Sequence, residues 1–251
     1  MANPILQART AAKQATHLLP HLSSSMTILD VGCGPGTISL GLAQAVPEGR
    51  VVGIDLNPAS IKQAQDLATK LGVTNAEFQV GSAENLAHFP DASFDIVHEH
   101  QLLPYLPKPV QAISEWRRVL KPDGILSLRS CSFITAVPEL PGLVDYFTLL
   151  PNILARRGGD VTAGRKHATW LREAGFDLTN AKLDSVAWEL SGVEGRATFA
   201  TGAGDRLRGP LLEFGMAAEK ECDGIRDAWE AWKGMEEGRV IALDSAVLAW
   251  K

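Results

Sequence analysis

The chain has 251 residues, of which 45% are hydrophobic and 21% are charged, and its formal net charge is −5. This composition excludes a disordered protein, and the acidic balance argues against a nucleic-acid partner, because phosphate binding requires a basic face. No segment reaches the roughly 20 apolar residues of a membrane span and the N-terminus lacks a signal pattern, so a cytoplasmic protein without a membrane span is predicted. Cys33, Cys131 and Cys222 lack metal-ligand spacing, so neither a metal site nor a disulfide framework is expected.

Strand-like and helix-like hydrophobic spacing alternate along the chain, which predicts a parallel sheet covered by helices on both faces. The expected strands lie near residues 27–31, 51–55, 76–80, 93–98, 124–130, 176–189 and 240–250. The expected helices lie near residues 5–20, 37–46, 58–71, 109–120 and 160–174, with further helices within 192–238. Asn57 and Pro58 form a favourable cap and first-turn pair for one of these helices.

The most informative segment is a glycine-rich turn that follows the first expected strand. Residues Ile28–Thr37 read ILDVGCGPGT, and the glycines at 32, 34 and 36 permit a tight turn and the close approach of a ligand. The helix that follows would direct its free N–H groups toward this ligand. The second expected strand ends at Asp55, whose carboxylate can accept both hydroxyls of a ribose. These two features predict a cofactor that contains adenosine.

Asp30, two residues before the first glycine, helps to distinguish two classes of cofactor. A carboxylate here would repel a pyrophosphate, and the third glycine of the dinucleotide fingerprint is missing at its spacing. S-adenosylmethionine has a positively charged α-amino group and sulfonium, so Asp30 can hold its aminoacyl end directly or through the Gly32 carbonyl and water. The alternative is that Asp30 only fixes the turn. The sequence favours S-adenosylmethionine.

Four segments carry a recognisable family pattern: Ile28–Thr37, Val51–Asn57, Gly81–Leu86, and Phe94–Val97 followed by Trp116–Gly124. Together they resemble class I S-adenosylmethionine-dependent methyltransferases, especially the small-molecule branch of ubiquinone and menaquinone methyltransferase-like proteins. The resemblance implies an α/β fold: a Rossmann-like, doubly wound sheet of about seven mostly parallel strands with a reversed final strand and helices on both faces. It implies one methyltransferase domain over residues 1–251, with helical or lid-like cap insertions near 131–158 and 192–238.

The resemblance also assigns cofactor contacts residue by residue. They are Asp30, Gly32, Cys33, Gly34, Gly36, Thr37, Asp55, Leu56, Ser82, Ala83, Glu84, His98 and Glu99. Leu56 is expected to cover one face of the adenine. Cys33 is expected to pack in the turn, because methyl transfer needs no covalent intermediate. Ser82 stands where the family usually has an acid that bonds the adenine amino group, so adenine recognition should be weaker or shared with Glu84.

The segment after the fourth expected strand should approach the methyl group. His100 is the candidate general base and His98 the second, because imidazole titrates near neutral pH; the alternative role is that of a positioning donor or a satisfied polar group. Glu99 replaces a small residue of related enzymes, and its carboxylate could stabilise the bound sulfonium, orient a substrate or turn to solvent. An acceptor that is already acidic would need no base.

The substrate is expected to lie under the two cap insertions. Residues 131–158 combine prolines with apolar side chains, which predicts an apolar lid, with a cover for the sheet or a homodimer contact as alternatives. The expected substrate contacts are Gln101, Phe133, Tyr146 and Phe147. Trp229 and Trp232 lie three residues apart on one helix, which is more typical of core packing than of an aromatic cage.

The sequence therefore predicts in-line methyl transfer from S-adenosylmethionine to an oxygen, nitrogen, carbon or sulfur atom of a small, hydrophobic molecule. The alternative is a protein that binds S-adenosylmethionine without methylating, as a cofactor-dependent cyclase or a binding subunit. Arg9 is expected either to pair with the carboxylate of the cofactor or to lie exposed on the first helix.

Overall fold

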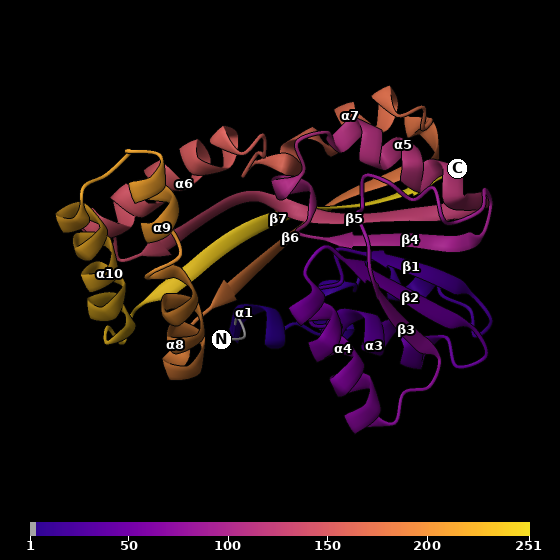
Figure 1. Cartoon of the computed structure of the whole chain (residues 1–251). Coiled ribbons are helices and arrows are strands. Elements are labelled where there is room, and N and C mark those ends of the chain that lie inside the picture. Colours follow the sequence, from indigo (N-terminus) through magenta and orange to yellow (C-terminus); the bar gives the residue numbers. More distant parts are fainter. Residues whose placement is uncertain (1–3) are drawn as a thin grey trace.

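The computed structural model describes residues 4–251, which form a seven-stranded sheet with helices on both faces (Figure 1). The strands are β1 (Thr27–Val31), β2 (Arg50–Asp55), β3 (Ala76–Val80), β4 (Phe94–His100), β5 (Leu120–Val137), β6 (Ala181–Leu190) and β7 (Arg239–Trp250). Their order in the sheet is β3-β2-β1-β4-β5-β7-β6. Strands β1 to β5 pair in parallel, whereas β7 runs antiparallel to β5 and β6. The predicted fold class, with its reversed final strand, is confirmed.

The helices are α1 (Pro4–Gln7), α2 (Ala11–Gln14), α3 (Thr37–Ala45), α4 (Pro58–Leu71), α5 (Pro109–Val119), α6 (Pro141–Arg156), α7 (His167–Glu173), α8 (Gly192–Ala203), α9 (Arg208–Glu213) and α10 (Glu219–Lys233). Short 3-10 turns lie at Leu19–His21, Leu103–Tyr105, Ala163–Lys166 and Leu178–Asn180. The predicted start of α4 is confirmed, because the Asn57 side chain accepts a hydrogen bond from the backbone N–H of Ala59 at 3.0 Å.

The single helix expected over residues 5–20 is wrong, because the chain breaks between α1 and α2. Thr10 is extended, with φ −139° and ψ 152°, and its N–H donates to the Gln14 side chain at 2.8 Å. The Leu6 carbonyl at the end of α1 accepts a hydrogen bond from the Thr37 hydroxyl at 3.2 Å. Side chains thus satisfy backbone groups at the break, which brings the N-terminal segment against the start of α3.

The apolar lid expected over residues 131–158 begins as a continuation of β5. This strand has 18 residues, and its pairing with β7 continues to the Val137–Arg239 pair. A register shift between Cys131 and Phe133 marks a bulge, which interrupts the alternation of buried and exposed side chains and explains why the strand was not expected. Helix α6 follows, so the segment is built from regular elements.

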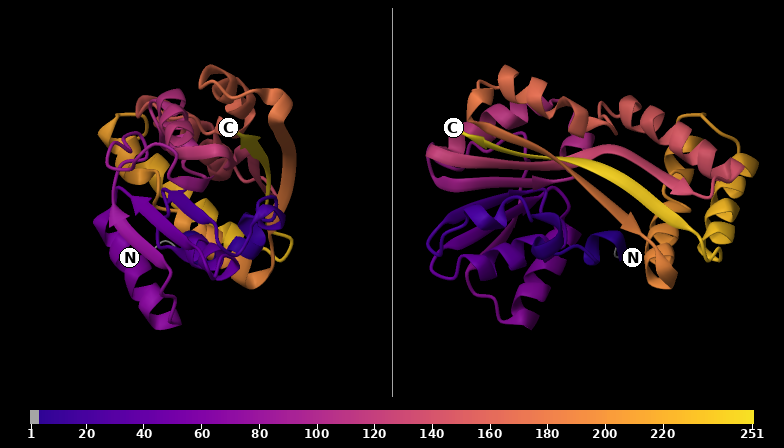
Figure 2. Two further views of the ribbon diagram at one scale, coloured as in Figure 1. Left: turned by 90° about the vertical axis from the view of Figure 1, so that its right-hand side faces the viewer. Right: turned by 180° about the vertical axis from the view of Figure 1, so that it is seen from behind.

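A second hydrophobic core lies at the far end of the long strands, where α6, α8 and α10 pack around β5 and β7 (Figure 2). At its centre Trp229 is 0% exposed, with ring centroids of Tyr146, Phe199 and Trp232 within 5.2 to 5.4 Å. The indole N–H of Trp232 donates to the Val137 carbonyl at 2.9 Å. Core packing is confirmed for both tryptophans.

The helices and the molecular surface add two observations. None of the helices within residues 4–251 combines the length and the hydropathy that a bilayer crossing requires.

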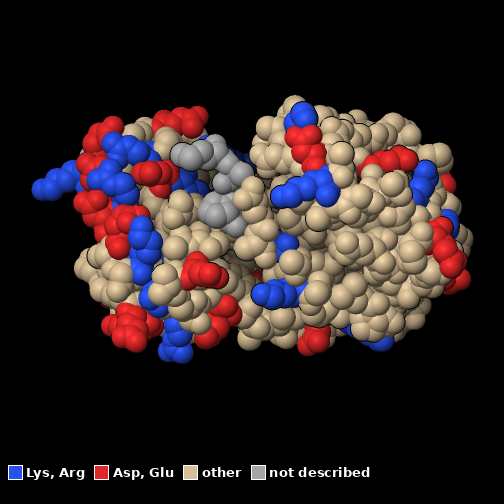
Figure 3. All heavy atoms as spheres, turned by 90° about the horizontal axis from the view of Figure 1, so that it is seen from below, with Lys and Arg blue, Asp and Glu red and all other residues tan. Residues whose placement is uncertain are grey.

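Charged side chains gather on the lobe formed by α8, α9 and α10, where acidic and basic residues are interspersed on the face seen in Figure 3. This face of the lobe therefore carries no field of a single sign.

Replacing Trp229 with alanine should lower the free energy of unfolding by about 3–5 kcal/mol, because a large cavity would remain at the centre of the second core. Leu183→Ala is the matched control, since this side chain is 53% exposed on β6, and its effect should stay within about 0.5 kcal/mol. Urea denaturation measures both. Equal losses would mean that Trp229 does not organise this core.

Candidate functional site

The glycine turn, residues 32–36, has the conformation that its composition requires. Gly32, Gly34 and Gly36 have φ angles of 71°, 54° and 77°, a region that residues with a Cβ rarely adopt. A Cβ at Gly36 would lie 2.7 Å from the Cβ of Ala64, so this glycine permits α3 and α4 to pack closely. A Cβ at Gly34 would meet no atom within 4 Å, so this glycine instead faces open space beside the turn.

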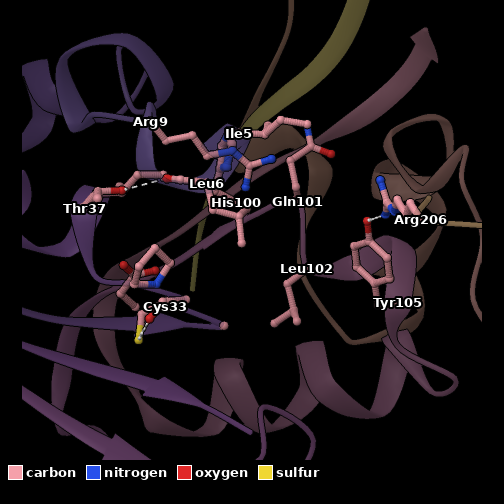
Figure 4. A pocket seen from close by; sticks show the side chains of 15 residues that line it. Ile5, Leu6, Arg9, Cys33, Thr37, His100, Gln101, Leu102, Tyr105 and Arg206 are labelled. Carbon is pink, nitrogen blue, oxygen red and sulfur yellow. Dashed lines mark hydrogen bonds between the residues drawn. The ribbon is translucent and has the colours of Figure 1, made fainter. Parts of the chain in front are cut away.

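That open space belongs to a cavity of about 270 Å³ at the C-terminal ends of β1 and β4 (Figure 4). One wall consists of the glycine turn and the start of α3, and the opposite wall consists of residues 100–102, which follow from the end of β4. Arg9, Tyr105 and Arg206 complete the lining, and Figure 4 shows Tyr105 and Arg206 together at the end away from Cys33. We call this space the cofactor cavity.

Asp30 lies in the lining of the cofactor cavity and is nevertheless only 3% exposed. Ser39 on α3 donates a hydrogen bond to its carboxylate at 2.5 Å, which links the end of β1 to that helix. Burial raises the pKa of Asp30 to about 7, although the Ser39 hydrogen bond opposes this shift. A cationic ligand beside this carboxylate would be stabilised strongly in such a poorly solvated place.

Asp55 closes the glycine turn from the neighbouring strand. One carboxylate oxygen accepts a hydrogen bond from the Gly34 N–H at 3.0 Å, and the other accepts one from the Asn57 N–H at 2.8 Å. Each oxygen retains acceptor capacity for a ribose hydroxyl. Leu56 follows with its side chain 68% exposed, as a residue that covers a flat ligand would be before binding.

The residues expected to contact adenine lie beyond Asp55 along the same edge of the sheet. Gly81, directly after β3, donates its N–H to the Asp55 carbonyl at 3.1 Å. The Ser82 hydroxyl accepts a hydrogen bond from the Glu84 N–H, and the Glu84 carboxylate accepts one from the Lys108 N–H, both at 3.2 Å. Ala83 is buried, and its carbonyl accepts a hydrogen bond from the Trp116 side chain. These residues flank the cofactor cavity and do not line it.

His98 and Glu99 were expected to contact the cofactor, but the structure places both in the core and outside the cavity lining. The ring of His98 shares a hydrogen bond with Ser127 at 3.0 Å, on the face of the sheet that carries His17. The Glu99 carboxylate is 0% exposed and accepts hydrogen bonds from the backbone of Leu102 and three other donors. Burial raises the pKa of Glu99 to about 7. Internal hydrogen bonds therefore hold the Glu99 carboxylate and one ring nitrogen of His98, whereas the Nε2 atom of His98 has no partner among residues 4–251.

His100, in contrast, lies in the wall of the cofactor cavity. Burial, together with the nearby charges of Arg9 and Arg129, holds the pKa of His100 well below its usual range. Its Nδ1 atom is buried without a hydrogen-bond partner among residues 4–251. His100 is thus a neutral imidazole at physiological pH, with one ring nitrogen available for a new hydrogen bond.

Gln101 is held at the cavity by a buried ion pair that was not expected from the sequence. Its side-chain amide donates to Asp244 at 3.1 Å, and its carbonyl oxygen accepts from the Cys131 N–H at 3.0 Å. Asp244 also receives hydrogen bonds from Arg129 and Trp188, both at 2.9 Å, and the two charged side chains are 2% and 1% exposed. The sequence does contain one indication of this ion pair: Asp244 is a charged residue in the middle of a mostly apolar strand, where a buried charge needs a partner.

A second, smaller cavity of about 110 Å³ adjoins the first, and we call it the apolar cavity. Tyr146 and Phe147 of α6 line it, as does Gln101, so the structure brings these three expected substrate contacts together. Phe133 does not line this cavity: it is 50% exposed and borders a further recess near Arg165, which shares Phe147 with the apolar cavity. The bulge next to Phe133 accompanies this change of facing.

A doubly wound sheet with a ligand-sized cavity at a glycine turn after β1, and an acid at the end of β2, defines a class of α/β enzymes that bind nucleotide cofactors. Gly34 provides the room that a cofactor needs beside the backbone, and Asp30 provides the negative charge that suits a sulfonium compound. Among residues 4–251, no three His, Cys, Asp or Glu side chains converge as metal ligands.

Comparison with known proteins identifies the family. Residues 22–175 match the family model described as a methyltransferase domain. A probable methyltransferase, ltbC, of Aspergillus luteorubrus is 33% identical over 98% of this chain and 92% of its own length. Demethylmenaquinone methyltransferase of Listeria monocytogenes is 30% identical over 64% of this chain and 67% of its own length. The crystal structure of the YcgJ protein from Bacillus subtilis superposes with a TM-score of 0.65 and 19% identity, covering 95% of this chain and 97% of that one.

The chain belongs to this methyltransferase family and is a class I S-adenosylmethionine-dependent methyltransferase. Its cofactor is accordingly S-adenosylmethionine and not a dinucleotide.

Replacing Asp244 with asparagine should lower the free energy of unfolding by about 3–5 kcal/mol, because the buried Arg129 guanidinium would lose its counter-charge. Asp184→Asn, at an exposed position on β6, is the matched control and should stay within about 0.5 kcal/mol. Urea denaturation of the two variants gives the comparison. A loss for Asp244→Asn no larger than the control would refute the role of the pair.

The buried histidines should make stability fall in acid. Burial lowers the pKa of His17 to about 4 and those of His98 and His167 to about 3, so the folded chain keeps them neutral while the unfolded chain takes up protons below about pH 6.5. Each such group removes about 1.4 kcal/mol of unfolding free energy per pH unit below that value. The raised pKa values of Asp30 and Glu99 act in the opposite direction.

His98→Gln isolates the contribution of one histidine to the pH dependence of the unfolding free energy, because it removes one proton-binding group from the unfolded chain. The loss of unfolding free energy between about pH 6 and about pH 4 should become shallower by about 1.4 kcal/mol per pH unit. His88→Gln, at an exposed position, is the control. Urea denaturation at several pH values measures the slopes, and identical slopes in both variants would refute the assignment.

Proposed function

We propose that this methyltransferase transfers a methyl group to an oxygen, nitrogen, carbon or sulfur atom of a small, hydrophobic molecule. The observation that carries the proposal is the junction of the two cavities. Ile5, Arg9, Gln101, Tyr105 and Arg206 line both, so one continuous wall serves the cofactor cavity and the apolar cavity. A molecule in the apolar cavity would therefore lie next to whatever occupies the cofactor cavity, as in-line transfer requires.

The walls of the apolar cavity support a hydrophobic occupant. Apart from the junction residues and Cys131, it is lined by Pro104, Ile134, Tyr146, Phe147, Leu150, Leu154, Val161, Trp188 and Phe199. Apolar and aromatic walls with a few polar groups at one end are typical of sites for small organic ligands. The polar end faces the cofactor cavity, so the acceptor atom would be directed there.

Bound S-adenosylmethionine supplies an electrophilic methyl group, and the residues of the chain hold it and exclude water. We assign Asp30 to the α-amino group, because this acidic residue belongs to the cavity lining and lies in a poorly solvated place. We assign Asp55 to the ribose hydroxyls and Leu56 to one face of the adenine, since both flank the glycine turn. Arg9 lines the cavity from the N-terminal segment and can pair with the carboxylate of the cofactor.

His100 is the proton acceptor that the geometry supports for substrates that must lose a proton. Its neutral ring lies in the cavity wall, and Nδ1 has no partner among the residues that the structure describes. We do not assign this role to His98, because it is 0% exposed and lies outside the cavity lining. The low pKa of His100 makes it a weak base, so an acceptor with its own acidity would react more readily.

Replacing Gly34 with alanine tests the assignment of the cofactor cavity. The new methyl group would enter the open space beside the turn and should weaken the binding of S-adenosylhomocysteine at least tenfold by calorimetry, while a positive φ costs about 1–2 kcal/mol of stability. Gly72→Ala is the matched control, since Gly72 after α4 also has a positive φ, of 67°, and a Cβ there also meets nothing within 4 Å. Unchanged affinity in a folded Gly34→Ala variant would contradict the assignment. Release of S-adenosylhomocysteine on incubation with lipophilic phenols, amines and thiols then separates methyl transfer from cofactor binding alone.

A further inference from the structure

The junction of the two cavities carries two guanidinium groups from segments far apart in the sequence. Arg9 comes from the break between α1 and α2, and Arg206 from the turn between α8 and α9. Arg206 donates a hydrogen bond to the Tyr105 hydroxyl at 2.5 Å and lies over that ring, with 5.9 Å to its centroid. Figure 4 shows Arg206 and Tyr105 at one end of the cofactor cavity, with Arg9 nearer to His100.

Neither guanidinium has an acidic partner within residues 4–251, since no Asp or Glu oxygen lies within 4.0 Å of either one. Arg208, two residues beyond Arg206, shows the contrast: it forms ion pairs with Glu219 and Asp223 on the outside of the cap. Arg206 therefore has no acidic partner at the junction, although acidic side chains of α10 pair with the nearby Arg208.

The surroundings of Arg9 and Arg206 do little to offset their positive charge. No Asp or Glu lines the apolar cavity, and Asp30, the acidic residue in the lining of the cofactor cavity, belongs to the wall formed by β1 and the glycine turn. Burial lowers the pKa of Arg9 to about 10; Tyr105 and Asp244 oppose this shift, and the nearby Arg206 acts in the same direction as burial. Two like charges beside apolar walls attract an anion strongly, since little water screens them.

We propose that the apolar cavity takes an apolar acid, a molecule with a hydrophobic body and one ionised oxygen, and that Arg206 and Tyr105 hold this oxygen. The inference rests on the proposed function, in which Arg9 pairs with the carboxylate of the cofactor. That pairing uses one of the two positive charges and leaves Arg206 for the substrate. Arginine suits this role because its fork of N–H donors can bind a carboxylate or a phenolate while it also contacts an aromatic ring.

An ionised acceptor also fits the absence of a strong base at the junction. When the oxygen is itself methylated, it forms a bond to the methyl carbon, the carbon–sulfur bond breaks, and the bonding electron pair stays on sulfur. An anion and a sulfonium then become two neutral products, and no proton has to move, so His100 is not required as a base. The methylated oxygen no longer has the charge that Arg206 held, which favours release of the product.

The test compares two probes of similar size and shape, 1-naphthoate and 1-naphthamide, by calorimetry on the full chain to which S-adenosylhomocysteine has been added, so that the carboxylate of that compound can occupy Arg9. The wild-type chain should bind the acid at least tenfold more tightly than the amide. Arg206→Gln should abolish this preference, and Arg208→Gln should retain it, because Arg208 lies outside the cavity. Circular dichroism confirms that each variant is folded, and Arg206→Lys, which keeps the charge, should retain part of the preference.

Binding of S-adenosylhomocysteine is measured on the same samples, and this keeps the two proposals apart. If the wild-type chain binds S-adenosylhomocysteine but shows no preference for the acid, or binds neither probe, the inference about Arg206 is overturned and the cofactor assignment stands. A preference that survives in Arg206→Gln would overturn it as well. If S-adenosylhomocysteine fails to bind while the acid preference depends on Arg206, the assigned cofactor cavity is wrong and the anion site stands.

Discussion

The buried ion pair between Arg129 and Asp244 is the interaction on which the geometry of the site depends. Arg129 lies on β5 and Asp244 on β7, so the pair joins the last parallel strand to the reversed strand. The same guanidinium donates to the carbonyls of Lys13 and Gln14, which attaches the N-terminal segment to the sheet. The other oxygen of Asp244 holds the Gln101 amide at the cavity. The two buried charges are stabilised by each other and by further hydrogen bonds, from Arg129 to two backbone carbonyls and from Trp188 and Gln101 to Asp244.

The position of the cavities follows from the length of β5 and β7. Both strands extend beyond the cofactor-binding half of the sheet and form the floor of the second core, so two cores share one sheet (Figure 2). The apolar cavity lies where these cores meet, between Gln101 at the end of β4 and Phe147 on α6. Specificity for the substrate can therefore vary in the second core while the glycine turn and its surroundings remain constant.

Local patterns predicted the part of the molecule that local interactions determine. The glycine turn, the cap at Asn57 and the sheet with a reversed final strand need only short-range spacing or a family pattern, and all of them agree with the structure. His98 and Glu99 were placed at the cofactor because they follow the expected fourth strand, whereas β4 continues to His100 and keeps them in the core. The sequence does not show where a strand ends when its last residues are polar but internally bonded.

Contacts between distant segments were beyond such reasoning. Arg129 and Asp244 are separated by 115 positions, and Tyr105 and Arg206 by 101, so neither pairing leaves a periodic signal. The bulge beside Phe133 likewise depends on the register with β7 and reverses the facing that simple alternation predicts. These are the features that give the cavity junction its charge and its shape.

The reversed strand has a consequence for how the chain can be divided. The family match ends at residue 175, yet β7, which pairs with both β5 and β6, comes from the last twelve residues before Lys251. A fragment that stopped at the end of the match would leave one edge of β5 unpaired from Ile125 to Val137. It would also leave the Arg129 guanidinium without its counter-charge. Strand β7 is thus an obligatory part of the folding unit, and exchange of cap segments between homologues has to leave it and its partner β6 in place.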